Sequence, residues 1–287
     1  MSTGVQVIPT GAALGADIAG CDIRAMDDAA FTIVRQAWLD HLVLRVRGQG
    51  VDDPAHMAFA RRFGALEVSP KTMFTGKPWL EDFPEMSRIT NIKKNGKPIG
   101  SLGNAECFWH TDMSYIDEPP AGSLLHAIEV PPAGGDTHFL NMYMALDALP
   151  PQLRAAIDGR SIKHESVHSS DGSVRRGMKE PESDDVRTYP GAIHPIVRTH
   201  PETGRQALFL GRRINSYVMG LPVDESEEVL DALWAHIDQP EFAWTQEWEV
   251  GDIVVWDNRC AMHKRDGFSD AHVRLMHRTV LKGDRPY

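Results

Sequence analysis

The run Phe108-Trp109-His110-Thr111-Asp112, together with the distant His263, is the most informative part of this chain of 287 residues. In an extended segment residues i and i+2 point to the same side, so His110 and Asp112 can converge on one ion. With His263 as a second imidazole, the set of two histidines and one carboxylate is typical of a reactive iron centre that keeps open positions. The sequence therefore predicts a metal site formed by His110, Asp112 and His263.

The His-x-Asp spacing is weak evidence when taken alone, because the chain contains thirteen histidines. His236 and Asp238 repeat the spacing, but they fall in an amphipathic stretch predicted to be helical, where their side chains lie about 200° apart around the axis. His200-Pro201-Glu202 also fits loosely, but the proline and the following Thr203-Gly204 predict a turn between strands. The other histidines without a partner at this spacing are interpreted as packing or surface residues: His126, His138, His164 and His194.

Further segments around these residues increase the specificity of the pattern. They occur in a fixed order: Trp109-His110-Thr111-Asp112, Pro119-Pro120-Ala121, Gly134-Gly135-Asp136-Thr137, Trp256-Asp257-Asn258-Arg259 with His263, then Arg274 and Met276-His277-Arg278. In order and spacing the chain resembles, over nearly its whole length, the taurine/2,4-D (TauD/TfdA) type of Fe(II)- and 2-oxoglutarate-dependent dioxygenases.

The resemblance implies a role for each matching residue. His110, Asp112 and His263 would bind Fe(II) on one face and leave three positions for 2-oxoglutarate and O2. Thr137 and Arg274 would hold the far carboxylate of 2-oxoglutarate, and Arg278 would face the acidic group of the substrate. The implied reaction hydroxylates the substrate and converts 2-oxoglutarate to succinate and CO2.

The pattern around the two arginines agrees with these roles. Residues 271–282 are predicted to form a strand on which Arg274 and Arg278 share one face. Their Cα atoms would lie roughly 13 Å apart, so each guanidinium could bind a different anion with its planar fork. Two solvated arginines on an edge strand are the alternative, and their position shortly after His263 favours the anion-binding interpretation.

The predicted elements are many short strands, with helices near the beginning and on one side. This pattern predicts a mainly β fold with flanking helices, an antiparallel double-sheet jelly roll, in one domain covering residues 1–287. Helices are expected at 27–40, 51–63, 142–157 and 224–238. Strands are expected at 42–46, 88–93, 122–130, 161–167, 242–249, 253–256 and 273–281, with a hairpin from 192–199 and 206–210. Residues 69–105 are predicted to be loops over the site, and the polar segment 169–189 a mobile loop that closes over the cosubstrate or a surface insertion.

Composition limits the remaining possibilities. The net charge of −10 and pI near 5.7 disfavour nucleic acid as a partner. No apolar run approaches the roughly twenty residues of a membrane span, and the start of the chain, Met1 to Pro9, lacks the pattern of a secretory signal. Three cysteines without metal-type spacing, Cys21, Cys107 and Cys260, argue against a disulfide framework. Cys107 and Cys260 lie close in sequence to His110 and His263, and small buried side chains are favoured for them over a place near the metal. We therefore expect a cytoplasmic protein that acts on a small anionic molecule. We expect neither a nucleic-acid nor a membrane partner. Relatives often self-associate, which favours a homo-oligomer.

Several positions depart from the pattern of the taurine-specific relatives. Ser69-Pro70 replaces a histidine before proline, and Glu106 replaces an asparagine, so Glu106 is either a contact for a substrate ammonium or a partner for a lysine such as Lys93. Arg212 and Arg213, beside Ile214, could add anion contacts, but a surface or interface role is favoured. We therefore expect a small carboxylate, sulfonate or zwitterion other than taurine, with Arg278, Ser69 and Glu106 as candidate substrate contacts.

Two other classes of function remain open at this point. Two histidines and an aspartate also bind zinc in metallohydrolases, with water at the open position. A jelly-roll binding protein with a decayed metal site is the second alternative. A hydrolase would leave Thr137 and Arg274 without a clear role, and a decayed site would not be expected to keep all three ligand types.

Overall fold

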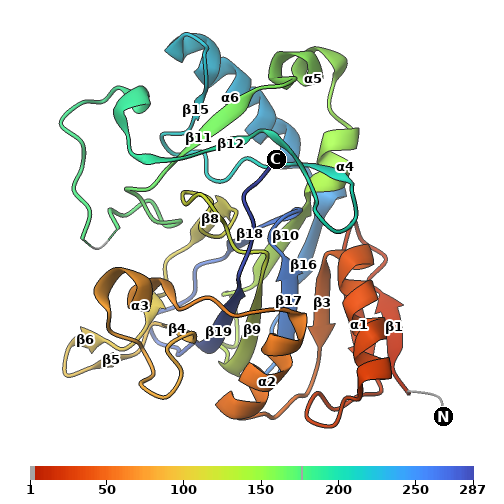
Figure 1. Cartoon of the computed structure of the whole chain (residues 1–287). Helices are drawn as coiled ribbons and strands as arrows, with labels where there is room; N and C mark the ends of the chain where they lie inside the picture. Colours follow the sequence, from red (N-terminus) through yellow and green to blue (C-terminus); the bar gives the residue numbers. More distant parts are fainter. Residues whose placement is uncertain (1–3, 176) are drawn as a thin grey trace.

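The computed structural model describes residues 4–175 and 177–287. Residues 1–3, at the start of the stretch Met1 to Pro9, and residue 176, within the predicted segment 169–189, lie outside the described residues. At its centre two mainly antiparallel sheets form the jelly roll, and helices surround it (Figure 1). In the part of the chain that the structure describes, no helix is long and apolar enough to cross a bilayer.

The larger sheet has eight strands in the order β1-β2-β3-β17-β9-β19-β4-β7. All neighbours are antiparallel except the pairs β2–β3 and β4–β7. The strands are β1 (Gln6–Pro9), β2 (Ala16–Ala19), β3 (Val43–Val46), β4 (Ser87–Thr90), β7 (Ser101–Leu102), β9 (Gly122–Glu129), β17 (Ile253–Asp257) and β19 (Leu275–Leu281).

The smaller sheet has four strands in the order β16-β10-β18-β8. They are β8 (Cys107–His110), β10 (Thr137–Asn141), β16 (Ala243–Gln246) and β18 (Ala261–Arg265). All three pairings are antiparallel. Because β8 pairs with β18, these two strands lie side by side although they are far apart in sequence.

The remaining elements flank these sheets (Figure 1). A three-stranded sheet joins β11 (Ser161–Glu165), β12 (Gly191–Pro195) and β15 (Tyr217–Val218), and two small hairpins pair β13 (Val197–Thr199) with β14 (Gln206–Leu208) and β5 (Lys93–Lys94) with β6 (Lys97–Pro98). The helices are α1 (Asp28–His41), α2 (Asp53–Phe63), α3 (Pro70–Thr75), α4 (Met142–Asp147), α5 (Pro151–Ile157) and α6 (Val223–Ile237), with 3-10 turns at Val186–Thr188 and Pro240–Phe242.

Strand β17 shows why the larger sheet is buried on both faces. Its apolar run Ile253-Val254-Val255-Trp256 does not alternate with polar residues, which is typical of a strand covered on both sides. Ile253 and Val255 pack in a cluster with the helices α1 and α2, whereas Val254 and Trp256 pack in the core that contains the smaller sheet. The helices therefore cover the outer face and leave the inner face to the jelly-roll interior.

The first two helices begin at Asp28 and Asp53, one and two residues after the predicted starts, and each is capped by an aspartate. The side chain of Asp27 accepts a hydrogen bond from the backbone N–H of Ala30 at 2.8 Å, and Asp52 does the same for Ala55 at 3.0 Å. Each carboxylate satisfies a backbone donor that the first helical turn leaves free. Pro54 follows within the first turn of α2, where a missing N–H costs nothing.

Four predictions of local structure were wrong in detail. The strand expected at 88–93 ends at Thr90, and Lys93 begins β5 of a separate hairpin. The single helix expected over 142–157 is two helices, because Pro150-Pro151 interrupts the chain between α4 and α5. The strand expected at 242–249 begins at Ala243 and ends at Gln246, after a 3-10 turn. In the hairpin expected from 192–199 and 206–210, only β13 pairs with β14, while β12 joins β11 in another sheet.

Candidate metal and cosubstrate site

The structure brings together the three predicted metal ligands. One ligand atom each of His110, Asp112 and His263 lies within 4.8 Å of the other two, and all three side chains are buried. Asp112 Oδ1 lies 3.9 Å from His110 Nε2 and 4.0 Å from His263 Nε2. Two neutral imidazoles and a carboxylate at these separations fit a divalent iron bound on one face.

Strand pairing accounts for the meeting of the two histidines. His110 is the last residue of β8 and lies directly opposite His263 of β18 in the antiparallel register. Asp112 lies two residues beyond the end of β8, so the expected extended segment is shorter than predicted. Its backbone is held by Asn258, whose Oδ1 accepts from the N–H of Asp112 at 2.8 Å and whose Nδ2 donates to its carbonyl at 3.0 Å.

Hydrogen bonds orient the ligand atoms toward the ion. His110 Nδ1 lies 2.7 Å from the carbonyl oxygen of Phe108, which can only accept, so Nδ1 carries the proton and Nε2 presents its lone pair. Ser123 Oγ donates to Asp112 Oδ2 at 2.9 Å and leaves Oδ1 toward the histidines. The ring of His263 is held by contact with Trp256, at 4.9 Å between ring centroids.

Burial and charge set the protonation states that a metal requires. Burial lowers the pKa of His263 to about 4, and burial together with repulsion from His263 lowers the pKa of His110 well below its usual value. Burial opposes ionisation of Asp112, but the Arg278 guanidinium and the two imidazoles outweigh it and lower the pKa of the carboxyl. Near neutral pH the site therefore offers two neutral imidazoles and one carboxylate.

Thr137 and Arg274 lie together beside Trp248. Trp248 Nε1 donates to Thr137 Oγ1 at 3.1 Å, and the guanidinium of Arg274 lies 5.7 Å from the centre of the Trp248 ring. On β10, Thr137 lies two residues from Phe139, which pairs with His263. Both predicted cosubstrate contacts are thus on the segments that surround the metal site.

The environment of Arg274 is that of an anion-binding residue. The side chain is buried, and its Nε and Nη2 find no hydrogen-bond partner among the described residues. Burial and the nearby Arg265 lower the pKa of Arg274 to about 9, which leaves it charged at neutral pH. A buried guanidinium without a carboxylate is costly, so a ligand carboxylate fits this position. The residues present therefore suit 2-oxoglutarate.

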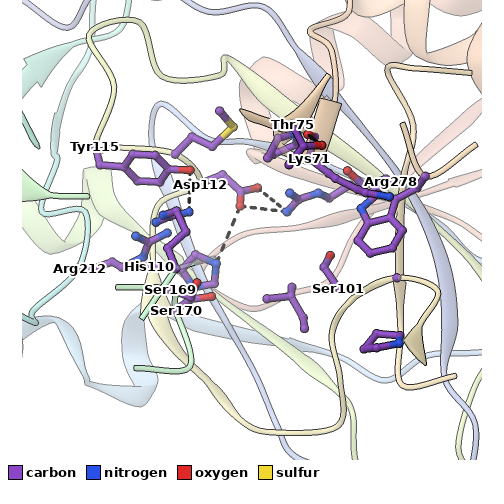
Figure 2. Close-up of a pocket in the computed structure, with 18 of the residues that line it drawn as sticks. Lys71, Thr75, Ser101, His110, Asp112, Tyr115, Ser169, Ser170, Arg212 and Arg278 are labelled. Carbon is purple, nitrogen blue, oxygen red and sulfur yellow. Dashed lines mark hydrogen bonds and ion pairs between the residues drawn. The ribbon is translucent and has the colours of Figure 1, made fainter. Parts of the chain in front are cut away.

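Arg278 lines a cavity of about 720 Å³ beside Asp112 (Figure 2). Its Nη1 lies 3.0 Å from Asp112 Oδ1, and its Nε has no partner in the described part of the chain. His110 and Asp112 line the same cavity.

The strand predicted to carry both arginines is shorter than expected. It begins at Leu275 and has a register shift at its start. Arg274 therefore lies before β19, and the two arginines do not share one face of a single strand.

The two predicted loop segments both contribute to this cavity. Pro70, Lys71, Thr75, Trp79 and Ser101 are among its lining residues from the first segment. Ser169, Ser170 and Arg175 contribute from the second. The position over the site agrees with the prediction, and closure of either segment over bound ligands stays a prediction.

Two of the three candidate substrate contacts lie away from the cavity. Ser69 is fully buried as the N-cap of α3, and its hydroxyl contacts the backbone N–H and Oγ1 of Thr72. Glu106 is exposed and lines a second pocket of about 470 Å³. It forms no ion pair with Lys93 in the described structure. The geometry therefore favours Arg278 alone among the three as a direct contact.

Arg212 and Arg213 differ from each other, so the interpretation of both as surface residues was wrong for one of them. Arg213 pairs with Glu227 and Asp231 of α6, as expected for a surface residue. Arg212 lines the cavity that contains His110 and Asp112. Neighbours in sequence point to different surroundings, which no periodic pattern in this loop indicated.

A second buried cluster, formed by His200, Asp257 and Cys260, does not suit a metal. Both oxygens of Asp257 accept from the guanidinium of Arg259, at 2.8 and 2.7 Å, and Oδ2 also contacts His200 Nε2 at 3.0 Å. Burial and the nearby Asp257 raise the pKa of the Cys260 thiol well above its usual value. These groups already satisfy one another, and the prediction that Cys260 is a small buried side chain is confirmed.

Comparison with known proteins identifies the class that this fold and site define. Residues 6–280 match the family model described as "Taurine catabolism dioxygenase TauD, TfdA family". The chain is 33% identical to an (S)-phenoxypropionate/alpha-ketoglutarate-dioxygenase of Delftia acidovorans over 99% of this chain and 97% of the relative. It is 34% identical to an alpha-ketoglutarate-dependent 2,4-dichlorophenoxyacetate dioxygenase of Burkholderia sp. (strain RASC), over 85% and 82% of the two chains.

Solved structures agree. A taurine dioxygenase from Burkholderia xenovorans superimposes with a TM-score of 0.78 at 29% identity, covering 99% of this chain and 92% of that one. AAD-2 in complex with Mn(II) and N-oxalylglycine gives a TM-score of 0.78 at 29% identity, with 98% of both chains covered. The chain belongs to the TauD/TfdA family and is a 2-oxoglutarate-dependent non-haem iron dioxygenase with a jelly-roll core. This assignment excludes the two alternatives left open by the sequence, a zinc-dependent hydrolase and a non-catalytic binding protein.

Proposed function

We propose that this dioxygenase hydroxylates a small organic acid, a carboxylate or sulfonate, held in the cavity beside Arg278. His110, Asp112 and His263 would bind Fe(II), and Thr137 and Arg274 would bind the far carboxylate of 2-oxoglutarate. The observation that supports the proposal is the buried Arg274, whose Nε and Nη2 have no partner among the described residues and whose guanidinium lies beside Trp248, which also contacts Thr137. The named relatives that act on phenoxyalkanoic acids support the choice of an acidic substrate.

Iron with 2-oxoglutarate and O2 supplies the oxidising chemistry in this family, and the residues of this chain supply binding, orientation and shielding. The Phe108 carbonyl and Ser123 fix the orientation of His110 and Asp112, so the ligand set is formed before the ion arrives. Arg274 would bind the far carboxylate of 2-oxoglutarate through two charge-assisted hydrogen bonds, which would fix the position of the cosubstrate relative to the metal. The loop segments 69–105 and 169–189 would limit the access of water to the reacting groups.

Arg278 is suited to orient the substrate. One of its nitrogens contacts Asp112, while its Nε has no described partner, so the guanidinium retains donors for an incoming acid. An acid held there lies next to the metal ligand Asp112. The C–H bond to be oxidised would be set by the distance between that acid group and the rest of the substrate.

Substrate-dependent release of succinate tests this function. The purified protein would be supplied with Fe(II), 2-oxoglutarate and O2, together with a panel of small carboxylates, sulfonates and zwitterions and a matched panel of neutral alcohols and amides. We expect acids to stimulate succinate release and the neutral panel to do so far less. Stimulation by the neutral panel alone would contradict the proposed substrate class. A weak visible band on adding Fe(II) and 2-oxoglutarate without oxygen checks cosubstrate binding separately.

A cytoplasmic location and a homo-oligomeric state belong to the same proposal. The first rests on the reducing conditions that free cysteines and Fe(II) require, since Cys21, Cys107 and Cys260 are all unpaired. The second is checked by sedimentation of the purified protein.

A further inference from the structure

The cavity beside the metal ligands is lined by a second arginine, the half-buried Arg212, whose Nε atom is buried. Figure 2 shows Arg212 and Arg278 on opposite sides of Asp112. Arg278 has a carboxylate partner in Asp112, whereas Arg212 has none within ion-pair distance among the described residues. Within residues 4–175 and 177–287 the guanidinium of Arg212 makes one hydrogen bond, from Nη1 to the carbonyl of His168 at 3.1 Å, and its buried Nε has no partner.

The backbone fixes Arg212 at the metal site. The carbonyl of the preceding Gly211 accepts from the N–H of Thr111 at 3.0 Å, and Thr111 lies between the ligands His110 and Asp112. Gly211 has a φ of +67°, and a Cβ there would come within 1.8 Å of His164 Nδ1. The loop therefore requires glycine to approach so closely, and this approach brings the next side chain to the cavity.

The charges near Arg212 increase its need for an anion. Arg175 lies next to it, and both guanidiniums lie over the ring of Tyr115, at 3.9 and 5.2 Å from its centre. Each nitrogen of Arg175 already has a partner: Nε donates to the Ser166 carbonyl, Nη1 to the Tyr115 hydroxyl and Nη2 to the His168 carbonyl. Burial and repulsion from Arg175 lower the pKa of Arg212. Of this pair, Arg212 is the one with a buried nitrogen that has no partner among the described residues.

We infer that Arg212 binds a second acidic group of the prime substrate, so that the preferred substrate is a dianion that spans the cavity between Arg278 and Arg212. This inference rests on the proposed function, and it narrows the substrate class from organic acids to diacids, such as dicarboxylates or carboxylates that also carry a sulfonate. A buried cation without a protein carboxylate is costly in the free enzyme and is neutralised when such a substrate binds.

Matched pairs of probes test the inference. We choose phenoxyacetate against 4-carboxyphenoxyacetate, and phenylmethanesulfonate against 4-carboxyphenylmethanesulfonate, which differ within each pair by one carboxylate. Binding is measured without turnover, by the change each probe causes in the visible band of the anaerobic enzyme loaded with Fe(II) and 2-oxoglutarate. We expect the dianion of at least one pair to bind the wild-type enzyme about tenfold or more tightly than its monoanion.

Arg212→Met removes the charge, Arg212→Gln provides a second neutral variant, and Arg212→Lys restores a cation. Arg213→Met is the matched control, because it removes an equal charge one residue away from a side chain that pairs with α6. We expect the neutral variants to lower the dianion-to-monoanion affinity ratio about 10- to 100-fold, as for loss of a charge-assisted contact. The ratio should recover in part in Arg212→Lys and stay unchanged in Arg213→Met, with 2-oxoglutarate affinity unchanged in all four variants.

Three outcomes would overturn the inference. In the first, wild-type enzyme shows no preference for either dianion. In the second, the neutral variants keep the preference and lose 2-oxoglutarate affinity, which would assign Arg212 to the cosubstrate. In the third, the neutral variants lose thermal stability but keep the dianion-to-monoanion affinity ratio. Arg212 would then have only a structural role, through its hydrogen bond to the His168 carbonyl. If wild-type enzyme gives no visible band with 2-oxoglutarate and no succinate, the proposed function fails instead.

Discussion

Replacing Arg274 by methionine should have two opposite effects, a loss of 2-oxoglutarate affinity and a gain in stability of the ligand-free protein. The side chain is 2% exposed, and its Nε and Nη2 have no partner among the described residues. Methionine has a similar length and carries no charge, so it can occupy the space beside Trp248 and Gly135 without an unpaired cation. A residue kept only for packing would not show both effects.

The magnitudes follow from the burial of the charge. Loss of one partner of a buried charge pair costs about 2–5 kcal/mol, so 2-oxoglutarate affinity should fall about 30-fold to several thousand-fold. The depression of the Arg274 pKa from 12.5 to about 9 corresponds to at most about 5 kcal/mol of unfavourable energy for the charged form. Arg274 stays protonated below pH 9, so this penalty is present throughout the neutral range and is relieved only as the pH rises above about 9. Part of it should be recovered in the variant, as about 1–4 kcal/mol or about 2–6 °C in Tm.

The assay combines three measurements on wild type, Arg274→Met and Arg274→Lys. Succinate release against 2-oxoglutarate concentration gives KM and kcat, the anaerobic visible band gives cosubstrate binding directly, and thermal unfolding without ligands gives Tm. Arg274→Lys keeps a charge but loses the fork, so it should lose affinity without the gain in Tm. The reasoning would be refuted by 2-oxoglutarate affinity within threefold of wild type, or by a fall in affinity for the organic acid alone.

Three further predictions concern the metal ligands and a buried histidine. Asp112→Ala should abolish iron loading and lower turnover at least about 1000-fold, because it removes the anionic ligand and leaves Arg278 unpaired; an iron stoichiometry near one per chain would contradict it. Ser123→Ala should weaken Mn(II) affinity about 10- to 100-fold, since its hydroxyl orients the Asp112 carboxylate, and titration followed by EPR measures this. His56 is fully buried, and burial lowers its pKa from 6.5 to about 3, so stability should be lost as the pH falls below about 6.5, when the unfolded chain takes up a proton that the folded chain refuses. In urea unfolding at pH 4.5 to 6.5, His56→Leu should reduce the dependence of the unfolding free energy on pH, by about 0.7 kcal/mol per pH unit at pH 6.5 and about 1.4 at pH 4.5. An unchanged dependence would assign the acid sensitivity to other groups.

Local signals in the sequence predicted local structure well where a side chain itself made the boundary. The helix starts expected at residues 27 and 51 lie within two residues of the observed ones, and there the carboxylates of Asp27 and Asp52 accept backbone hydrogen bonds. Pro150-Pro151 carried an equally local signal, and the predicted helix over 142–157 disregarded it. The error in this helix arose because the apolar periodicity was given more weight than the two prolines, although both signals were present in the sequence.

Non-local contacts set the limit of the sequence argument. The register that places His110 opposite His263 joins β8 to β18 and is not encoded in either strand alone, so the resemblance to a family carried that part of the prediction. Ser69 illustrates the converse, because a residue that replaces a ligand in relatives need not keep its function, and its hydroxyl caps α3. The position of Arg212 depends on the contact between Gly211 and Thr111, which no residue spacing reveals.

The segment Trp256-Asp257-Asn258-Arg259 explains why the family pattern extends beyond the metal ligands. None of these residues belongs to the metal-binding triad, yet Trp256 contacts the ring of His263, and Asn258 binds both backbone groups of Asp112. Asp257 and Arg259 form an ion pair, and Arg259 also donates to Glu202 at 2.6 Å, which ties this turn to the β13–β14 hairpin. A metal site formed from distant segments needs such support, because an error of about 1 Å in one ligand weakens the whole set. Asn258→Ala should therefore lower metal affinity without removing any ligand, and unchanged Mn(II) affinity in a folded variant would show that β8 and β18 hold the site unaided.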